Sequence, residues 1–423
     1  MYLKLLSFVF FLFFSSLVTA QVFTLQQAEK RALDYYPIAK LKKNYREVAD
    51  LNRSSISKIW YPQLNAGGQA TYQSDVTKIT IPNAPFVVEP LSKEQFKFNI
   101  DVNQMIYDGG YSKAQQEIAS VNASVEEAKI EVELHRLRER IQQLYLGTIY
   151  LDQLIHQLSF VKNDLEQGIK KMNAQLEGGV VYRSSVDVLK AEILKTEQRE
   201  IEFQASRATY IGALAILTDT ILNNDVVLEK PIYSTGVETG LMGLQSTLFS
   251  SQKSMVEKQA ELIRSTKNPK ANLFAQGGYG RPGLNMLKNE FDVYGIGGIR
   301  FNWSLSNFYT NKNEKKLLVI SRQNILLQEE TFNKNTKVQA DQFEKEIIKL
   351  KALIEKDETI VGLRKAIKES ATAQLEAGVI TSNDFLREVN AEDVARQTLK
   401  AHEIQLLQAE LQLNMLIGKP TKK

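Results

Sequence analysis

Gln175-Leu176-Glu177-Gly178-Gly179-Val180-Val181 returns about 200 residues later as Gln374-Leu375-Glu376-Ala377-Gly378-Val379-Ile380. An acid and an apolar pair follow each copy, as Asp187-Val188-Leu189 and as Asp384-Phe385-Leu386. Self-similarity at a fixed period indicates one structural unit that is used more than once. The chain is therefore interpreted as a tandem duplication, with a first repeat over residues 21–222 and a second over 241–423. The segment between them, residues 223–240, is rich in turn-forming residues and is predicted to be a linker.

The N-terminus has the pattern of a secretory signal peptide. Lys4 precedes an apolar run over residues 5–14, and small residues then lead up to Gln21. This predicts cleavage after residue 20. The alternative, a retained membrane anchor, needs a longer run. No later stretch approaches 18 consecutive apolar residues, so we expect an exported protein without a membrane-spanning helix.

Composition excludes several classes of function. The chain has no cysteine, which rules out disulfides, zinc–thiolate sites and iron–sulfur clusters. Its 53 basic and 49 acidic residues are interspersed, which is not the pattern of a nucleic-acid-binding surface. The three histidines lie far apart and no nucleophile–base arrangement is recognisable. We therefore expect no metal site, no cofactor and no enzymatic activity.

Proline placement and hydrophobic spacing predict very long helices. No proline occurs between Pro90 and Pro231 or between Pro282 and Pro420, and an interior proline would break a helix. In the first tract apolar residues recur in alternating steps of three and four, which predicts a coiled-coil seam over residues 112–175, about 95 Å long. The second tract repeats the pattern more loosely. Returning helices are expected over about 186–222 and 383–417, with hairpin tips at 176–186 and 376–384.

Four segments have a period of two instead. In residues 96–103 one face is wholly apolar and the other is polar or charged, as in a half-buried strand. Strands are predicted at about 63–72, 96–107, 270–279 and 293–305, each long enough to cross a bilayer when tilted. Four strands are too few to close a spanning barrel, and an open sheet edge is not tolerated in lipid. If these strands span a membrane, copies of the chain must share one barrel.

Taken together, these features resemble the TolC-type outer membrane efflux protein family. The opening Thr24-Leu25-Gln26-Gln27-Ala28-Glu29-Lys30-Arg31-Ala32-Leu33 and the later Gln104-Met105-Ile106-Tyr107-Asp108-Gly109-Gly110 are similar to that family's motifs, although the counterpart at residues 303–309 lacks the paired glycines. The resemblance implies a mainly α-helical fold whose long hairpins form a periplasmic tunnel. It also implies a homotrimer with a shared twelve-stranded barrel in outer membrane lipid. Such a passive exit duct works with a periplasmic adaptor protein and an inner-membrane transporter.

One alternative of a different class stays open. A periplasmic coiled-coil adaptor or tethering protein also has helical hairpins, but it needs no paired lipid-facing strands. The exported cargo, whether a small molecule or a polypeptide, is not predicted by the sequence.

The hairpin tips are the first candidate site. Gly178, Gly179 and Gly378 lie where a helix must turn back, so a purely structural role in the turn is one interpretation. The resemblance implies in addition that neighbouring apolar side chains form an exposed end that docks the adaptor: Val180, Val181, Val379 and Ile380.

Charged residues beyond the tips are the second candidate. The resemblance implies that Asp384 helps to constrict the periplasmic entrance and selects cations, with Asp187 as its weaker counterpart. Arg387 stands where the family often has a second acid, and Tyr182 and Arg183 could supply gate-closing hydrogen bonds. The plain alternative is that acids in a first helical turn favour the helix dipole, with caps available from Ser184, Ser185 and Ser382.

Aromatic residues at the strand ends are the third candidate. They are expected to form a membrane-interface belt, and the alternative is that they are ordinary strand residues: Tyr72, Tyr107, Tyr279, Trp303 and Tyr309.

Overall fold

The computed structural model describes residues 22–78, 90–231 and 240–418, so the predicted signal peptide lies outside the described residues. Two long helical hairpins and four paired strands dominate this part of the chain, which confirms the predicted fold class. The chain divides into two compact units. Unit 1 comprises residues 1–39, 133–243 and 336–423, and unit 2 comprises 40–132 and 244–335. Each unit takes segments from both sequence repeats.

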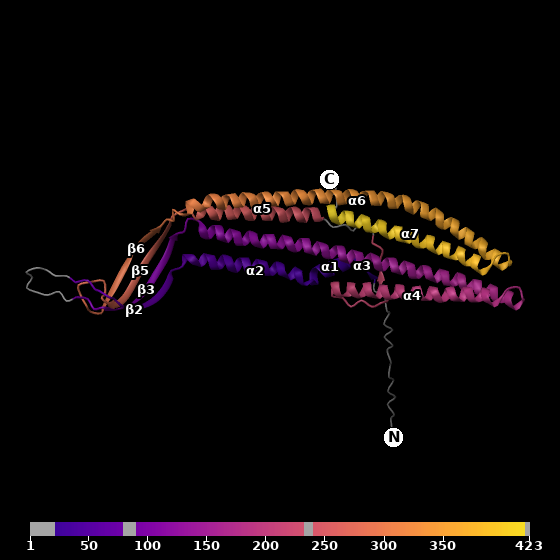
Figure 1. Cartoon of the computed structure of the whole chain (residues 1–423), viewed down its shortest axis with the longest axis horizontal. Helices are drawn as coiled ribbons and strands as arrows, with labels where there is room; N and C mark the ends of the chain where they lie inside the picture. The colour runs from indigo at the N-terminus through magenta and orange to yellow at the C-terminus, as the bar shows by residue number, and fades with distance from the viewer. Residues whose placement is uncertain (1–21, 79–89, 232–239, 419–423) are drawn as a thin grey trace, which may run out of the picture. The chain divides into compact units, whose positions relative to one another are not determined.

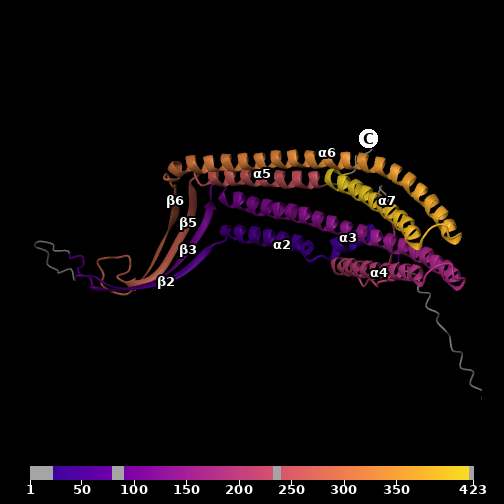
Figure 2. The same ribbon diagram turned by 45° about the vertical axis from the view of Figure 1, so that its right-hand side comes forward.

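Unit 2 holds a four-stranded antiparallel sheet in the order β2-β3-β5-β6. The strands are β2 (Gln63–Tyr72), β3 (Glu94–Tyr107), β5 (Lys270–Arg281) and β6 (Asp292–Asn302), and Figures 1 and 2 show them side by side in this order. They coincide with the segments of alternating polarity. The alternation continues past Asn302 to Leu305, but residues 303–305 leave the sheet and lead into the next helix.

Helices pack along one another in unit 2. They are α2 (Pro37–Ser57), the short η1 (Lys58–Trp60), α5 (Leu241–Ser265) and the first parts of α3 (Tyr111–Glu177) and α6 (Asn307–Glu376). Ion pairs join neighbours: Lys253 to Glu329 at 3.1 Å and Lys258 to Glu117 at 2.8 Å. Phe249 and Phe332 meet edge to face between α5 and α6.

Two helices are far longer than those of ordinary globular proteins. Helix α3 (Tyr111–Glu177) has 67 residues and α6 (Asn307–Glu376) has 70. At 1.5 Å per residue each is about 100 Å long. The seam predicted over residues 112–175 is therefore one uninterrupted helix. No helix in the described ranges is long and apolar enough to cross a membrane.

Each long helix turns back into a shorter one within unit 1. Helix α4 (Arg183–Thr218) returns beside α3, and α7 (Ser382–Ile417) returns beside α6 (Figures 1 and 2). The hairpin ends share a core that contains Leu165, Met172, Leu189, Leu375 and Phe385, each at most 2% exposed. Apolar burial of this kind holds both hairpin ends together.

A two-stranded parallel sheet, which the sequence pattern does not predict, holds the start of the described chain in place. Strand β1 (Val22–Phe23) pairs in parallel with β4 (Val227–Leu228), which lies in the predicted linker. The buried hydroxyl of Tyr145 on α3 lies 2.7 Å from the Phe23 carbonyl oxygen and 2.8 Å from that of Glu229. Helix α1 (Leu25–Tyr35) follows, with a capping box between Thr24 and Gln27.

Candidate functional site: the hairpin ends and the two-faced sheet

The two hairpin tips have the same backbone geometry. Gly179 and Gly378 have φ values of 72° and 68°, the left-handed conformation that glycine adopts without steric cost. The next residue closes each turn, because the Val180 and Val379 N–H groups each donate 2.9 Å hydrogen bonds to the Gln175 and Gln374 carbonyl oxygens. The repeated sequence thus encodes the same C-terminal cap twice.

The four apolar tip residues divide into two kinds. Val180 and Val379 are 70% and 72% exposed, whereas Val181 and Ile380 pack against the shared core. The Gln175 side-chain amide donates to the Leu375 and Glu376 carbonyl oxygens at 2.9 and 3.0 Å. The two tips are therefore held next to each other, and each presents one valine to solvent.

Asp384 lies in the first turn of α7, where it completes a capping box with Thr381. The hydrogen bonds from the Thr381 hydroxyl and N–H to the carboxylate lower the pKa of Asp384 below its ordinary value. Arg387 approaches it at 3.7 Å and also contacts Glu388 at 3.1 Å. The cap is Thr381 and not Ser382, whose buried hydroxyl contacts the Met172 sulfur at 3.2 Å instead.

The first hairpin has a weaker version of this arrangement. Tyr182 is the N-cap residue of α4, but its side chain makes no capping hydrogen bond and is 84% exposed. Neither Ser184 nor Ser185 therefore occupies the cap position. Arg183 and Asp187 approach each other only at 4.0 Å, and both are exposed.

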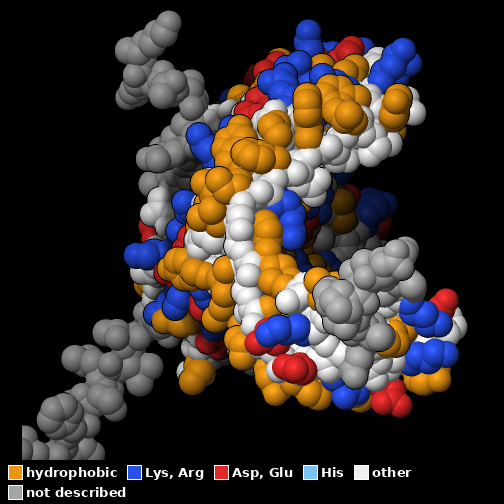
Figure 3. Space-filling view, turned by 90° about the vertical axis from the view of Figure 1, so that its left-hand side faces the viewer, with side chains coloured by type: hydrophobic (Ala, Val, Ile, Leu, Met, Phe, Trp, Pro, Cys, Tyr) orange, Lys and Arg blue, Asp and Glu red, His pale blue; other side chains and the backbone are white. Residues whose placement is uncertain are grey.

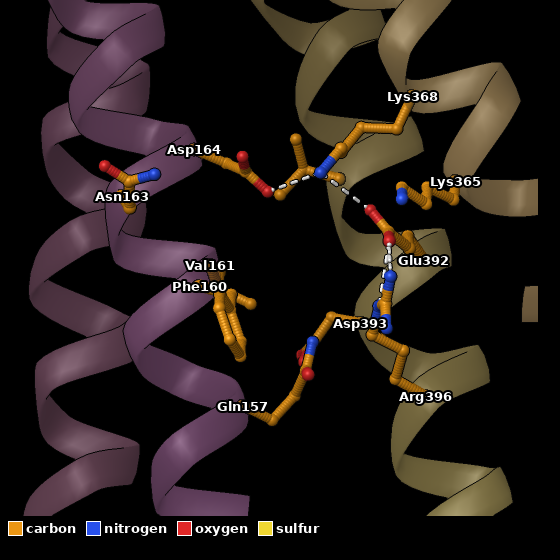
Figure 4. A pocket seen from close by; sticks show the side chains of 11 residues that line it. Gln157, Phe160, Val161, Asn163, Asp164, Lys365, Lys368, Glu392, Asp393 and Arg396 are labelled. Atoms are coloured by element: carbon orange, nitrogen blue, oxygen red, sulfur yellow. Dashed lines mark hydrogen bonds and ion pairs between the residues drawn. The ribbon is translucent and has the colours of Figure 1, made fainter.

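An ion network that the sequence does not predict lies behind the tips. The Lys368 ammonium on α6 contacts Asp164 of α3 at 2.7 Å and Glu392 of α7 at 2.9 Å, beside a cavity of about 250 Å³ (Figure 4). Arg396 donates to the same Glu392 at 2.6 Å. On α4, Arg199 donates to the nearly buried Asp393 at 3.1 Å. Side chains from all four hairpin helices are thus joined by charge.

The network shifts the pKa values of its members in the direction that keeps them charged. Burial opposes the charge of Lys368, but hydrogen bonds to Asp164 and Glu392 outweigh it and raise the pKa of Lys368. Burial likewise opposes ionisation of Glu392, but Lys368 and Arg396 hold the pKa of that carboxyl below its ordinary value. The sequence signal for this network is the presence of charged residues within a helical seam. A single sequence does not show which of these residues contact one another.

The histidines do not form a site. His135 is fully buried in α3, which lowers its pKa to about 4, and His402 lies 2.5 Å from Asp357. His156 packs edge to face against Phe160. Among the described residues, no group of three or more histidine or acidic side chains could hold a metal ion.

The sheet of unit 2 has two faces of different character. The strand register places apolar, glycine and tyrosine residues along one face, with Glu94, Gln104 and Arg281 at its ends. Along this apolar face run Leu64, Ala66, Gly68, Ala70, Tyr72, Phe96, Phe98, Ile100, Val102, Leu273, Ala275, Gly277, Tyr279, Val293, Gly295, Gly297, Ile299 and Phe301. All but Val102 are exposed to solvent in the single chain. Figure 3 shows hydrophobic side chains gathered on the surface at this end of the molecule, with charged side chains around them.

The opposite face is mostly polar. Asp101 accepts hydrogen bonds there from Asn99 and, at 2.7 Å, from Gln276. Arg300 stacks over Phe274 with its guanidinium 4.6 Å from the ring centre. The outer edges of β2 and β6 have no partner strand in the described part of the chain.

The predicted belt residues lie near both ends of the strands, and all of them are exposed. Tyr72 and Tyr279 lie toward the loops that join the strands of each pair, and Tyr279 stacks on Phe291 with ring centres 5.4 Å apart. Tyr107, Trp303 and Tyr309 lie where the strands meet the helices.

Several solved structures that share this arrangement are outer membrane proteins. The outer membrane protein VceC of Vibrio cholerae superimposes with a TM-score of 0.69 at 16% identity, over 94% of this chain and 97% of that one. The MtrE outer membrane channel of Neisseria gonorrhoeae, in its open state, gives 0.68 at 14% identity over 93% and 89%. The CmeC outer membrane channel of Campylobacter jejuni gives 0.66 at 14% identity over 93% and 85%.

The similarity to these proteins lies in the fold, because the sequence identity is low. No protein-family model and no curated protein matches the sequence. The chain has the fold of these outer membrane channels, which is the fold that the resemblance to the TolC-type family predicts.

Proposed function

We propose that this protein is the outer membrane exit duct of a tripartite export system, through which small molecules or polypeptides leave the periplasm passively. The observation that carries the proposal is the sheet of unit 2, which has one face that is apolar except at its ends and one mostly polar face. Neither of its outer edges has a partner strand among the described residues. An exposed apolar surface of this extent marks an interaction site. The apolar face is suited to contact lipid, and the mostly polar face is suited to line a water-filled lumen.

The open edges support an assembly of several copies. Backbone groups without partners are not tolerated in hydrocarbon, and the smallest spanning barrels have about eight strands. The four strands of one chain are too few, so β2 and β6 must pair with strands of neighbouring copies. Three copies would supply the twelve strands that the family resemblance implies, and the long helices would then line a periplasmic tunnel.

The hairpin tips are the proposed docking end for a periplasmic adaptor protein, which in turn joins an inner-membrane transporter. Val180 and Val379 support this assignment because they are exposed side by side on the two hairpins. In a trimer, three copies of Asp384 are proposed to line the entrance and to favour cations. Gating is proposed as a separation of the hairpins that widens this entrance.

The rival proposal is a periplasmic adaptor or tether that never enters a membrane. Such a protein would have similar helical hairpins, but an apolar sheet face exposed to water would serve no function in it. That face therefore favours the channel.

Membrane fractionation combined with conductance measurements tests the proposal. The full chain, expressed in a Gram-negative host, should sediment with the outer membrane as an SDS-resistant oligomer and should conduct ions in planar bilayers. A monomer that stays in the soluble periplasmic fraction would favour the rival proposal and end the channel assignment.

A further inference from the structure

Basic side chains gather at one end of the sheet in unit 2. Four short segments connect the strands to helices at this end: residues 58–62, 108–113, 264–270 and 303–316. We call their basic residues the basic collar, and they are Lys58, Lys113, Arg264, Lys267, Lys270, Lys312, Lys315 and Lys316. Only Asp108 and Glu314 are acidic in the same segments.

The members of the basic collar lack direct ion pairs with the described residues, although Lys270 and Lys113 lie near enough to Asp108 and Glu117 to help lower the pKa values of these carboxyls. None of its members forms an ion pair with any residue in the described ranges. Asp108 is buried, and its carboxylate caps α3 by accepting from the N–H groups of Gly110 and Ser112 at 2.8 and 2.7 Å. Nearby Lys258, outside the collar, differs because it contacts Glu117 at 2.8 Å and Glu261 at 3.1 Å.

The opposite end of the sheet lacks this imbalance. The described residues there, 73–78, 90–95 and 281–292, comprise loops and the adjoining strand ends and contain four basic and four acidic side chains. Lys78 approaches Asp75 at 3.8 Å, and Arg281 approaches Glu94 at 3.8 Å. Excess positive charge is thus specific to the end where the strands meet the helices.

Exposed aromatic residues occupy the same level as the basic collar. Both tryptophans of the chain, Trp60 and Trp303, are there, at 39% and 56% exposure. The Trp303 indole N–H donates to the Lys267 carbonyl oxygen at 2.9 Å, and Lys267 lies over the Phe308 ring at 5.1 Å. Amphipathic rings of this kind favour the boundary between hydrocarbon and water.

We propose that the basic collar binds the phosphate groups of anionic glycerophospholipids in the membrane leaflet on the helix side. The inference rests on the proposed function, because it needs the sheet to lie in a bilayer. Lysine and arginine extend their apolar stems along such a boundary and place the charge among headgroups. Unpaired cations beside a lipid-facing surface attract anionic lipids, and the attraction weakens as salt screens it.

Quenching of the two tryptophans by brominated lipids tests the proposal, since both indoles belong to the level of the collar. The full-length protein is reconstituted with brominated phosphatidylglycerol or brominated phosphatidylcholine. We expect phosphatidylglycerol to occupy the sites next to the tryptophans about threefold more strongly, with the preference lost at high salt. In the variant K312Q/K315Q/K316Q the preference should fall toward unity.

A matched variant removes the same charge elsewhere on the same helix. K334Q/K337Q/K345Q begins 18 residues beyond Lys316, about 27 Å further along α6. It should keep the wild-type lipid preference, and the SDS-resistant oligomer of each variant checks assembly. If wild-type protein is quenched equally by both lipids, or if the collar variant keeps the full preference, the inference is overturned while the channel stands. If neither lipid quenches the tryptophans, the sheet is not in the bilayer and both proposals fail.

Discussion

The Lys368 ammonium on α6 lies 2.7 Å from the Asp164 carboxylate on α3, although 204 positions separate the two residues in the sequence. Because each residue belongs to a different repeat, this contact joins the first hairpin to the second. Glu392 of α7 lies 2.9 Å from the same ammonium. One lysine therefore connects three helices behind the tips.

Replacing Lys368 should loosen this connection. Lys368→Met leaves the Asp164 carboxylate without a cation and leaves Glu392 with Arg396 alone. Because this group of charges is only partly buried, the loss costs about 1–3 kcal/mol. We expect the helical signal to melt several degrees lower in thermal unfolding followed by circular dichroism. Lys365→Met is the control, because Lys365 is exposed and only approaches Glu369 at 4.0 Å. Equal melting of the two variants would show that the network adds nothing to stability.

The pH dependence of stability should report Glu392. Its pKa in the folded chain lies below the ordinary value of 4.5. The charged form is therefore stabilising above pH 4.5, and this contribution is lost as the pH falls through the folded pKa. Urea unfolding between pH 6 and pH 3 should show a shallower acid loss in Glu392→Gln than in the wild type. Glu369→Gln, at an exposed position, should retain the wild-type slope; an unchanged slope in Glu392→Gln contradicts the assignment.

Neighbouring positions on β3 separate the two faces of the sheet. Ile100 faces the apolar side and Asn99 the polar side. On the proposed lipid face, Ile100→Lys should cost about 2–4 kcal/mol near the bilayer midplane and deplete the SDS-resistant oligomer from the outer membrane. Asn99→Lys should assemble normally and change only ion selectivity. The reverse result would place lipid on the other face.

The proposed entrance ring makes Asp384 a test of selectivity. Asp384→Asn removes the charge but keeps an oxygen that can accept the Thr381 hydrogen bonds. In planar bilayers we expect the ratio of cation to anion permeability to fall about twofold. Asp384→Ala also removes the carboxylate half of the capping box, so a change confined to that variant would assign Asp384 to helix capping alone. Unchanged selectivity in both variants discards the ring.

The exposed tip valines test adaptor docking. Replacing both Val180 and Val379 with Asp would bury unpaired charge in an apolar contact. Binding of the adaptor should therefore weaken at least about tenfold, or 1.4 kcal/mol. Site-specific crosslinking to the adaptor of the same export system measures the loss. Thr at the same two positions keeps the shape without a charge and should retain most of the crosslinking. Full retention by the Asp variant would move the docking surface away from the tips.

The sequence predicts the helices and strands of this fold well, because the hydrophobic periodicity of each kind of element is clear. In residues 96–103 every second side chain is apolar, and on β2 these side chains lie beside only alanine, glycine and leucine. The helical seam is equally legible over the length of α3. The alternation misleads only at residues 303–305, where side chains still alternate but the backbone has left the sheet.

Other features depend on contacts that no local pattern encodes. Strands β1 and β4 have two residues each, too few to show a period, and they pair across about 200 positions. Thr381 and Ser382 are both suitable caps, and the burial of Ser382 against Met172 decides between them. The charged residues of the ion network look like any solvated helical positions until the two hairpins are brought together.

The unpaired edge of β6 has a consequence for the export that we propose. A free strand edge is a template for misassembly and aggregation while the chain crosses an aqueous compartment. Gly295, Gly297 and Gly298 lower the strand propensity of that edge. Accidental pairing there gains little, which would leave the edge free for the neighbouring copies of the proposed assembly.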